Sequence, residues 1–517
     1  MKRALLLVTL VMLAAACPAP KATAPVKHDR DTTDPGLVVL VVIDQFPEWS
    51  LERKRTELTH GFARILREGE WRVGRHPSAA TLTGPGHALL GTGMPPAQSG
   101  IIANEWWSRE FNRKVKAADD ENGNTSNKWL RVPGLGDAIA AAHTGAKAVA
   151  VALKNRASVL PLGHAGLALY YDVKTASFTS YGGNPTWLAA HNRAHPIAPR
   201  LVPWQPQDPV LLAKLSGVVD AQVGEVGEKG FSTTFPHDPK ATKDPNDAVY
   251  AMPLGNEIVL EAALAAIDGE QLGADTNIDV LIVSLSAHDY IAHGWGHESW
   301  EAWDSELRLD VALEQFLAEL DHKVGKGRWA LILTSDHGGA PLPESVHGGR
   351  YTDEQIKAAA NQAASLVLGP GEWIAYANLP NVYFSQAALA QDPKELENAR
   401  KKIVSALKAF PGLAFADRTD SVAGHCDDRK DDERALCLSF DPERSGDFFY
   451  FPAQGWIVEE EGERLATAHG SLNDYDRNVP VVLLPFDRKP HPPLAVPGPV
   501  IPLTDVAPML EQWLRLP

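Results

Sequence analysis

Aspartate and histidine follow three strongly apolar runs of the chain. The runs cover residues 37–43, 280–285 and 329–333, and the polar residues after them are Asp44, Asp289, His293, Asp336 and His337. Continuous apolar runs of this length predict strands buried on both faces, as in a parallel sheet covered by helices. Ligand sites in such sheets lie at the carboxyl ends of the strands. We therefore expect these side chains to meet at one edge of the sheet.

Together these side chains could hold metal ions. Asp289 and His293 are four residues apart and share one face of a helical turn. His469, in a later turn of small residues, is a sixth candidate ligand. Six aspartate and histidine ligands without cysteine suit two Zn²⁺ or similar divalent ions. For any single one of these residues, the alternative to a metal ligand is an aspartate that caps a helix or a histidine that satisfies hydrogen bonds in the core.

A candidate nucleophile lies in the segment Thr-Leu-Thr-Gly-Pro-Gly-His at residues 81–87. The glycines and the apolar residues that follow indicate the start of a helix at Thr83. A hydroxyl at that position faces the positive end of the helix dipole and could attack an anionic group. The alternative is a threonine that caps the helix and does no chemistry.

The elements that must position these residues alternate along the chain. Further buried strands are expected at 147–153 and 481–484, the last of them preceded by Pro480 at its start. Helical patterns lie between the strands, at 209–215, 256–267, 298–323, 353–368 and 393–409. This alternation predicts an α/β/α sandwich with a mainly parallel sheet. The stretches around 100–250 and 365–460 are rich in proline, glycine and tryptophan, and we expect cap insertions there rather than independent domains.

The N-terminus has the pattern of a secretory signal peptide at residues 1–16. Lys2 and Arg3 precede an apolar run too short to span a bilayer. Cys17 follows three alanines, as in a bacterial lipobox, so it would carry a lipid anchor; the alternative is ordinary cleavage without a lipid. Residues 17–35 then form a flexible tether to a catalytic domain at 36–517. The protein is thus expected in the periplasm or secreted, with membrane contact only through that lipid.

Composition excludes several classes of protein. The chain has 517 residues, and its 65 acidic against 49 basic residues give a formal charge of -16. This balance argues against nucleic acid as a partner but not against a small anionic substrate. The 3 cysteines exclude a disulfide-stapled scaffold. Cys426 and Cys437 flank a polar loop, where we expect a local disulfide in preference to a metal pair.

Taken together, the motifs resemble the alkaline phosphatase superfamily. In detail they are similar to its bacterial branch with a threonine nucleophile, the phosphate-irrepressible alkaline phosphatases, close to the nucleotide pyrophosphatase/phosphodiesterases. The motifs that carry the resemblance are Val-Ile-Asp44, Thr83-Gly-Pro-Gly-His87, Gly100-Ile-Ile-Ala-Asn104, Asp289-x-x-x-His293, Ser335-Asp336-His337-Gly and Ala-His469-Gly. The resemblance implies an alkaline phosphatase-like fold from about residue 37 to 484.

The resemblance also implies two zinc ions per chain. One would be held by Asp289, His293 and His469. The other would be held by Asp44, Asp336 and His337 together with the oxygen of Thr83. It further implies hydrolysis of small-molecule phosphate monoesters through a phospho-threonine intermediate on Thr83.

Three further residues are assigned by the same resemblance. Asn104 would donate a hydrogen bond to a phosphoryl oxygen. Lys154 and Arg156, after the strand at 147–153, would contact the oxygens of a monoester dianion, which carries one more charge than a diester. A solvated basic pair is the alternative for Lys154 and Arg156. The alternative function is a phosphodiesterase or nucleotide pyrophosphatase on the same site, and the oligomeric state stays open.

Overall fold

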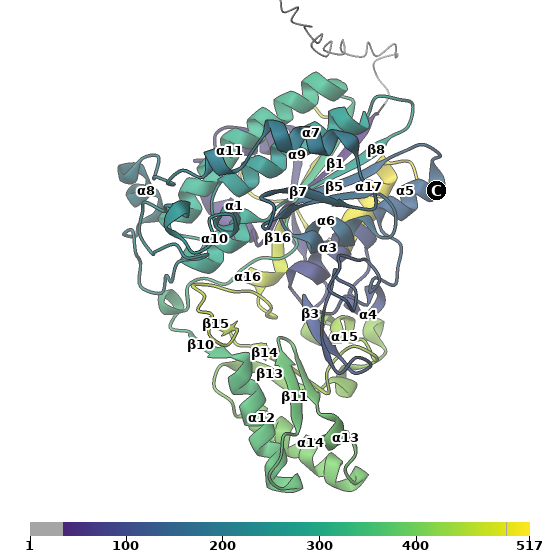
Figure 1. Cartoon of the computed structure of the whole chain (residues 1–517), viewed down its shortest axis with the longest axis vertical. Coiled ribbons are helices and arrows are strands. Elements are labelled where there is room, and N and C mark those ends of the chain that lie inside the picture. The colour runs from purple at the N-terminus through teal and green to yellow at the C-terminus, as the bar shows by residue number, and fades with distance from the viewer. Residues whose placement is uncertain (1–34, 493, 517) are drawn as a thin grey trace, which may run out of the picture. The chain divides into compact units, whose positions relative to one another are not determined.

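The structure of the protein is a computed structural model that describes residues 35–492 and 494–516 (Figure 1). The predicted signal peptide, Cys17 and all but the last residue of the tether lie outside the described residues. Among those that are described, no helix combines the length and the apolar character needed to cross a bilayer.

A nine-stranded sheet forms the centre of the described part of the chain. Its strands, from one edge to the other, are β17 (Val500–Pro502), β2 (Glu70–Arg75), β16 (Asn478–Leu484), β9 (Trp329–Thr334), β1 (Leu37–Ile43), β8 (Asp279–Leu285), β5 (Ala148–Ala152), β6 (Leu167–Asp172) and β7 (Ser177–Tyr181). The run β9-β1-β8-β5-β6 is parallel. Within it, β1, β8 and β9 are buried at every position. The predicted α/β sandwich with a mainly parallel sheet is confirmed.

Helices cover both faces of this sheet because successive side chains of each strand point to opposite sides. Leu37, Val39 and Val41 of β1 pack in one core and Val38 and Leu40 in the other. The first face is covered by α1 (Glu48–Lys54), α2 (Gly61–Glu68), α9 (Leu254–Glu270), α10 (Ala287–Trp295) and α11 (Trp300–Leu320). The second is covered by α3 (Thr83–Thr92), α5 (Leu135–Ala142), α6 (Asn155–Leu162) and α17 (Val506–Trp513).

The strand β16 differs from its prediction. It runs antiparallel to β9 and begins at Asn478, so Pro480 lies inside the strand and not before it. At Pro480 the strand pairs with Val73 of β2, and its pairing with β9 starts only at Val482. A residue without an N–H is tolerated there because this part of the strand has a neighbour on one side only.

A second sheet lies between β9 and β16 in the sequence. Its strands, in spatial order, are β11 (Ile374–Asn378), β12 (Asn381–Phe384), β14 (Phe448–Pro452) and β13 (Leu413–Arg418). The helices α12 (Asp353–Leu368) and α14 (Pro393–Lys408) share an apolar core with it. At the two ends of this insertion, β10 (Gly349–Thr352) pairs with β15 (Trp456–Glu459). Figure 1 shows the insertion apart from the central sheet, beyond the β10–β15 pair.

The predicted helices are confirmed as α8 (Pro209–Ser216), α9, α11, α12 and α14. The first predicted insertion, at about 100–250, contributes more to the centre than expected, because β5, β6 and β7 belong to the main sheet. Its remaining elements include the hairpin of β3 (Glu105–Ser108) and β4 (Arg113–Lys116), and α7 (Thr186–Ala194). Short helices complete the fold: α4 (Pro96–Ser99), α13 (Gln386–Leu389), α15 (Asp431–Ser439) and α16 (Asp474–Arg477).

Candidate active site

The residues named from the sequence meet at the carboxyl ends of the parallel strands. Val42 of β1 lies opposite both Ser284 of β8 and Thr334 of β9, so these three strands end level with one another. Asp44 follows β1, and α10, with two candidate ligands, follows β8. Thr83 is the first residue of α3, and His469 lies on the loop between β15 and α16.

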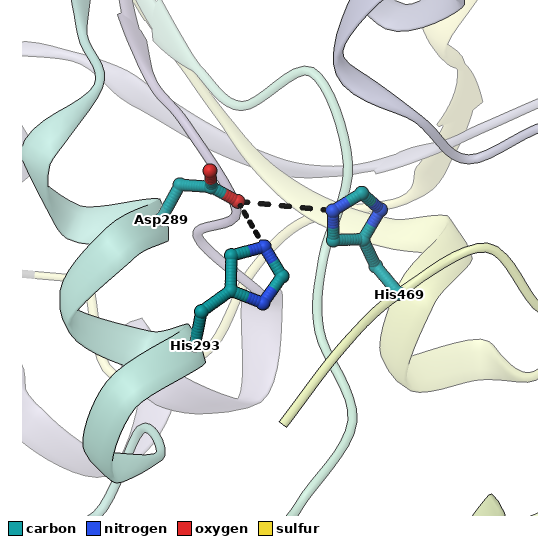
Figure 2. Close-up of side chains that lie close together, drawn as sticks. All are labelled: Asp289, His293 and His469. Atoms are coloured by element: carbon teal, nitrogen blue, oxygen red, sulfur yellow. Dashed lines mark ion pairs between the residues drawn. The ribbon is translucent and has the colours of Figure 1, made fainter. Parts of the chain in front are cut away.

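Asp289, His293 and His469 form the first cluster, called here the Asp289 group. Figure 2 shows the two imidazoles turned toward one carboxylate oxygen. Nε2 of His293 lies 3.1 Å and Nε2 of His469 lies 3.7 Å from Oδ1 of Asp289. Asp289 and His293 occupy successive turns of α10, as their spacing predicts, whereas His469 comes from a distant loop.

Asp44, Asp336 and His337 form the second cluster, the Asp44 group, in which all three residues are buried. Nε2 of His337 lies 3.4 Å from Oδ2 of Asp336 and 3.7 Å from Oδ1 of Asp44. The rings of His337 and His469 stack with centroids 3.7 Å apart, so the two groups are neighbours.

Hydrogen bonds to the backbone orient all three imidazoles. Each Nδ1 of His293, His337 and His469 lies within hydrogen-bond distance of a carbonyl oxygen. These carbonyls belong, in the same order, to Thr467, Gly338 and Thr81, at 2.8, 2.9 and 2.8 Å. Because a carbonyl can only accept, Nδ1 carries a proton, and in the neutral ring the Nε2 lone pair then faces the carboxylates.

Carboxylate oxygens face those lone pairs without hydrogen-bond partners. Among the described residues, Oδ1 of Asp44, Oδ1 of Asp289 and Oδ2 of Asp336 are buried and lack a hydrogen bond. Acceptor thus faces acceptor in both groups, an arrangement that is costly in a buried site unless a cation lies between them. Histidine nitrogens and carboxylate oxygens with backbone-anchored Nδ1–H groups are what a zinc site requires. The residues present therefore fit a metal ion in each group.

Lys154 joins the two groups. Its ammonium donates to Oδ2 of Asp44 at 2.6 Å and to Oδ2 of Asp289 at 2.5 Å. Burial opposes the charge, but Asp289 and Asp44 raise the pKa of Lys154 above its ordinary value, so it stays cationic. Even so, three buried carboxylates outnumber this one ammonium, which leaves negative charge for metal ions to neutralise.

The pKa values of Asp44 and Asp289 are shifted in opposite directions. Burial raises the pKa of Asp44 well above its ordinary value, and the charges of Asp289 and Asp336 raise it further. Burial also acts on Asp289, but the charge of Lys154 holds its pKa well below the ordinary value. Asp289 therefore stays ionised, and Asp44 is the group whose ionisation a bound cation would favour most.

Thr83 and Asn104 lie beside the Asp44 group. Oγ1 of Thr83 is 3.5 Å from Nε2 of His337, and the residue is buried at the N-terminus of α3. Oδ1 of Asn104 accepts a hydrogen bond of 2.7 Å from the N–H of Gly84. With the carboxamide oxygen held in this way, Nδ2 is the end of Asn104 that can donate to a ligand.

Arg156, the second residue of the predicted basic pair, lies near Lys154. Arg156 lies in the first turn of α6, and its Nε is buried without a hydrogen-bond partner among the described residues. Its charge also acts to lower the pKa of Lys154, which places the two cations near one another. Both are thus at the site, but Lys154 contacts the carboxylates directly.

Two histidines beside the site received no role from the sequence. Nδ1 of His87 lies 3.1 Å from Oδ2 of Asp336, and Nε2 lies 2.8 Å from Oγ of Ser284. His288 has Nδ1 3.0 Å from the carbonyl oxygen of Asp44. The spacing of four between Thr83 and His87 on one helix could have indicated the first; no sequence pattern indicates the second.

Comparison with known proteins identifies the family. The family model for type I phosphodiesterase / nucleotide pyrophosphatase matches residues 38–472. The chain belongs to this family. As a member of the type I phosphodiesterase / nucleotide pyrophosphatase family with alkaline phosphatases among its relatives, it is a hydrolase of phosphate esters.

Alkaline phosphatases are among its similar relatives. Alkaline phosphatase PafA of Elizabethkingia meningoseptica is 30% identical over 516 residues, covering 93% of this chain and 92% of PafA. Alkaline phosphatase PhoV of Synechococcus elongatus is 30% identical over 479 residues, covering 88% of this chain and 86% of PhoV. The crystal structure of wild-type PafA superposes with a TM-score of 0.82 at 27% identity, covering 94% of this chain and 96% of PafA.

Two further solved structures are similar to this chain. One is a PafA variant in which a threonine, an asparagine, a lysine and an arginine are substituted, with a TM-score of 0.80 at 26% identity and coverage of 94% and 96%. The other is murine ectonucleotide pyrophosphatase / phosphodiesterase 5 in complex with AMP, which covers 94% of this chain and 96% of its own. Its TM-score of 0.55 at 13% identity shows a shared fold alone.

Proposed function

We propose that the protein is a zinc-dependent phosphate monoesterase that acts through a phospho-threonine intermediate on Thr83. The observation that carries this proposal is the pair of three-residue groups in which unpartnered carboxylate oxygens face histidine lone pairs beside a buried hydroxyl. Small-molecule phosphate esters are the proposed substrates, and the net negative charge of the chain argues against nucleic acid.

Zinc would be held by the two groups, one ion by Asp289, His293 and His469 and one by Asp44, Asp336 and His337. When bound, two such ions would stabilise negative charge on the attacking and leaving oxygens of an in-line displacement. The three Nδ1–H to carbonyl hydrogen bonds fix the imidazoles with Nε2 turned inward, which is the orientation that a metal ligand needs.

Thr83 would supply the nucleophile. Its Oγ1 would form a bond to phosphorus while the bond from phosphorus to the leaving oxygen breaks, giving an alcohol and phospho-Thr83. Water would then attack phosphorus, break the bond to Oγ1 and release inorganic phosphate. The position of Thr83 at the N-terminus of α3 supports this role, because the helix dipole stabilises anionic oxygens there.

The other polar residues would hold the phosphoryl group. Nδ2 of Asn104 would donate to one phosphoryl oxygen while Gly84 fixes its carboxamide. Lys154 and Arg156 would contact the remaining oxygens, whose second charge distinguishes a monoester from a diester. The PafA variant supports this assignment, because its substituted threonine, asparagine, lysine and arginine follow the same chain order as the four residues named here, with the same spacing from threonine to asparagine and from lysine to arginine.

The second candidate function is a phosphodiesterase or nucleotide pyrophosphatase, which the name of the matching family favours. It would use the same metal groups and Thr83.

We propose a periplasmic or secreted location, with a lipid at Cys17 as the sole membrane contact. Labelling of the expressed protein with a radioactive fatty acid, and its loss in Cys17→Ser, would test the lipid.

The deciding experiment measures kcat/KM of the zinc-loaded protein for an aryl phosphate monoester and for the matched diester. A preference for the monoester of at least about a hundredfold, lost on chelation and restored by zinc, is the expected result. A preference for the diester would replace the monoesterase with the phosphodiesterase. Activity that survives thorough chelation would refute the metal requirement itself.

A further inference from the structure

The backbone segment that leads to Thr83 is held by hydrogen bonds to a helix of the second insertion. Residues 76–82 connect β2 to α3 and contain neither helix nor strand, yet the segment is buried almost throughout. Buried N–H groups of such a segment must find acceptors elsewhere. Two of these acceptors come from the helix α15, which lies in the second insertion, far along the chain.

Ser439, the last residue of α15, supplies one of them. Its Oγ accepts from the N–H of Ala79 at 2.8 Å and from the N–H of Ala80 at 3.3 Å. The same hydroxyl donates to the carbonyl of Ala435 at 2.8 Å, and that carbonyl also accepts from Ala79 at 3.2 Å. Ser439 is 1% exposed, so water cannot readily replace it. A hydroxyl has one donor and two acceptor sites, and all three are used here.

The held segment reaches both metal groups within a few residues. The carbonyl of Thr81, the residue after Ala80, accepts from Nδ1 of His469 at 2.8 Å. Thr81 also donates from Oγ1 to the carbonyl of Ser471. Thr83 follows two positions later. A shift of the backbone at Ala79 and Ala80 would therefore move the nucleophile and turn His469 at the same time.

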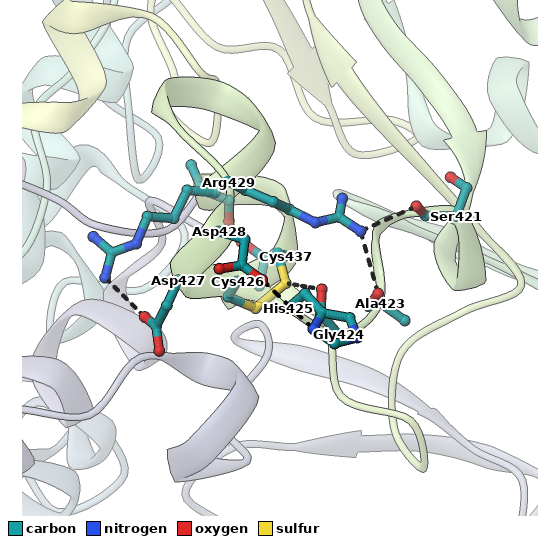
Figure 3. Close-up of a disulfide and its surroundings, with 12 residues drawn as sticks. Ser421, Ala423, Gly424, His425, Cys426, Asp427, Asp428, Arg429 and Cys437 are labelled. Atoms are coloured by element: carbon teal, nitrogen blue, oxygen red, sulfur yellow. Dashed lines mark hydrogen bonds and ion pairs between the residues drawn. A yellow bond between two sulfur atoms is a disulfide. The ribbon is translucent and has the colours of Figure 1, made fainter.

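The helix that carries Ser439 is itself tied by covalent and polar links. The disulfide Cys426–Cys437 joins α15 to the loop before it, and Figure 3 shows this loop gathered around the disulfide. Arg429 donates to the carbonyls of Ser421 and Ala423, at 3.5 and 3.2 Å. α15 has nine residues and receives no side-chain cap from Lys430, so it would be a marginal helix by itself.

Apolar contacts also join α15 to the segment that leads to Thr83. Ala435 and Leu436 pack with Ala79 of the held segment and with Phe449 and Phe451 of β14. The insertion thus reaches the segment before Thr83 through one apolar cluster and one hydroxyl. The disulfide, closed two residues before Ser439, limits how far that hydroxyl can move.

We propose that Ser439 is a positioning residue for Thr83 and His469, and that the Cys426–Cys437 disulfide maintains its position. The proposal rests on the function proposed above, because it assigns the held segment a part in phosphoryl transfer. It predicts that the second insertion contributes to turnover without contacting the substrate.

The test compares Ser439→Ala with the wild type and with Ser385→Ala. Ser385 is a matched control in the same insertion, since its Oγ caps α13 by accepting from Ala388 and donates to the carbonyl of Glu372. For Ser439→Ala we expect kcat to fall by roughly ten- to a hundredfold with little change in KM. Amide hydrogen exchange at Ala79 and Ala80 should accelerate, with exchange in β1 and β8 unchanged, and zinc affinity should fall about tenfold.

The disulfide gives a second, independent arm. Reduction of the folded wild type should lower kcat and accelerate exchange at residues 76–82, and the double variant Cys426→Ser, Cys437→Ser should show the same changes without responding to reductant. If Ser439→Ala does not fold, this arm decides alone. Unchanged kcat and unchanged exchange in both arms would overturn the proposal. A wild type that hydrolyses no phosphate ester would refute the proposed function, while exchange and zinc affinity would still test the positioning.

Discussion

Nζ of Lys154 lies 2.5 Å from Oδ2 of Asp289, a carboxylate whose other oxygen faces two histidines. A second hydrogen bond, to Asp44, places the ammonium between the two metal groups. The ammonium that we propose for the phosphoryl group is therefore positioned by one carboxylate from each metal group.

The basic pair should discriminate between substrates. Arg156→Ala and Lys154→Ala should each lower kcat/KM for an aryl phosphate monoester by roughly ten- to a hundredfold, and for the matched diester by much less, because the diester lacks one charge. Steady-state kinetics with both substrates checks this, with exposed Arg193→Ala as the control. Equal losses on both substrates would contradict the assigned role.

Thr83→Ala should remove turnover and leave the metals in place. The proposed nucleophile is lost, whereas the six aspartate and histidine side chains remain, so kcat should fall by at least about a thousandfold. Zinc content by elemental analysis should match that of the wild type. Thr92→Ala, at the other end of α3, is the control and should keep both properties. Turnover near the wild-type rate in Thr83→Ala would exclude the phospho-threonine.

His293→Ala should act on metal binding itself. It deletes one of three ligands from the Asp289 group, so we expect the affinity for one zinc ion to fall by more than about a hundredfold. Competition with a chromophoric chelator measures this for both ions. His322→Ala is the control, since its side chain is 81% exposed. Loss of activity with both zinc affinities intact would show that His293 is not a ligand.

Asp353, at the start of α12, should make stability depend on pH. Burial raises its pKa from 3.8 to about 7, and its Oδ1 accepts a hydrogen bond from the hydroxyl of Tyr450. The folded state then holds a proton that the unfolded state releases. The contribution of this carboxyl is therefore fully present below pH 3.8 and is lost as the pH rises toward about 7.

The variant Asp353→Asn isolates this effect because its side chain is neutral at every pH. Between about pH 4 and 7 the wild type should lose stability relative to the variant by on the order of 1 kcal/mol per pH unit. Thermal midpoints of both proteins, measured across this range and again at about pH 8, check the prediction. A constant difference between the two midpoints would show that Asp353 ionises normally in the folded protein.

The centre of the fold and the candidate ligands could be predicted from the sequence for one physical reason. Strands buried on both faces need continuous apolar runs, and the polar residues that end them then stand out. Asp44, Asp289 and Asp336 were found in this way, and the structure brings them together. His469 was a candidate because it lies in a turn of small residues, and the motifs added Asn104, whose position on a loop leaves no periodic pattern.

The remaining features depend on pairing that composition does not encode. β16 is as apolar as its parallel neighbours, so the direction in which it runs and the place of Pro480 within it could not be derived. β2 is half-buried with mixed polarity, and so it left no apolar run. Ser439 lies 360 residues from Ala79, and a single serine at the end of a short helix gives no local indication of such a contact.

The order of the ligands along the chain constrains how the protein is made. The Asp44 group is complete once His337 has been synthesised, but the Asp289 group needs His469, which follows the whole second insertion. A ribosome adding about 5–20 residues per second would complete one metal group several seconds before the other. A nascent chain could therefore hold one metal but not two, and both metal groups are complete only when translation is nearly finished.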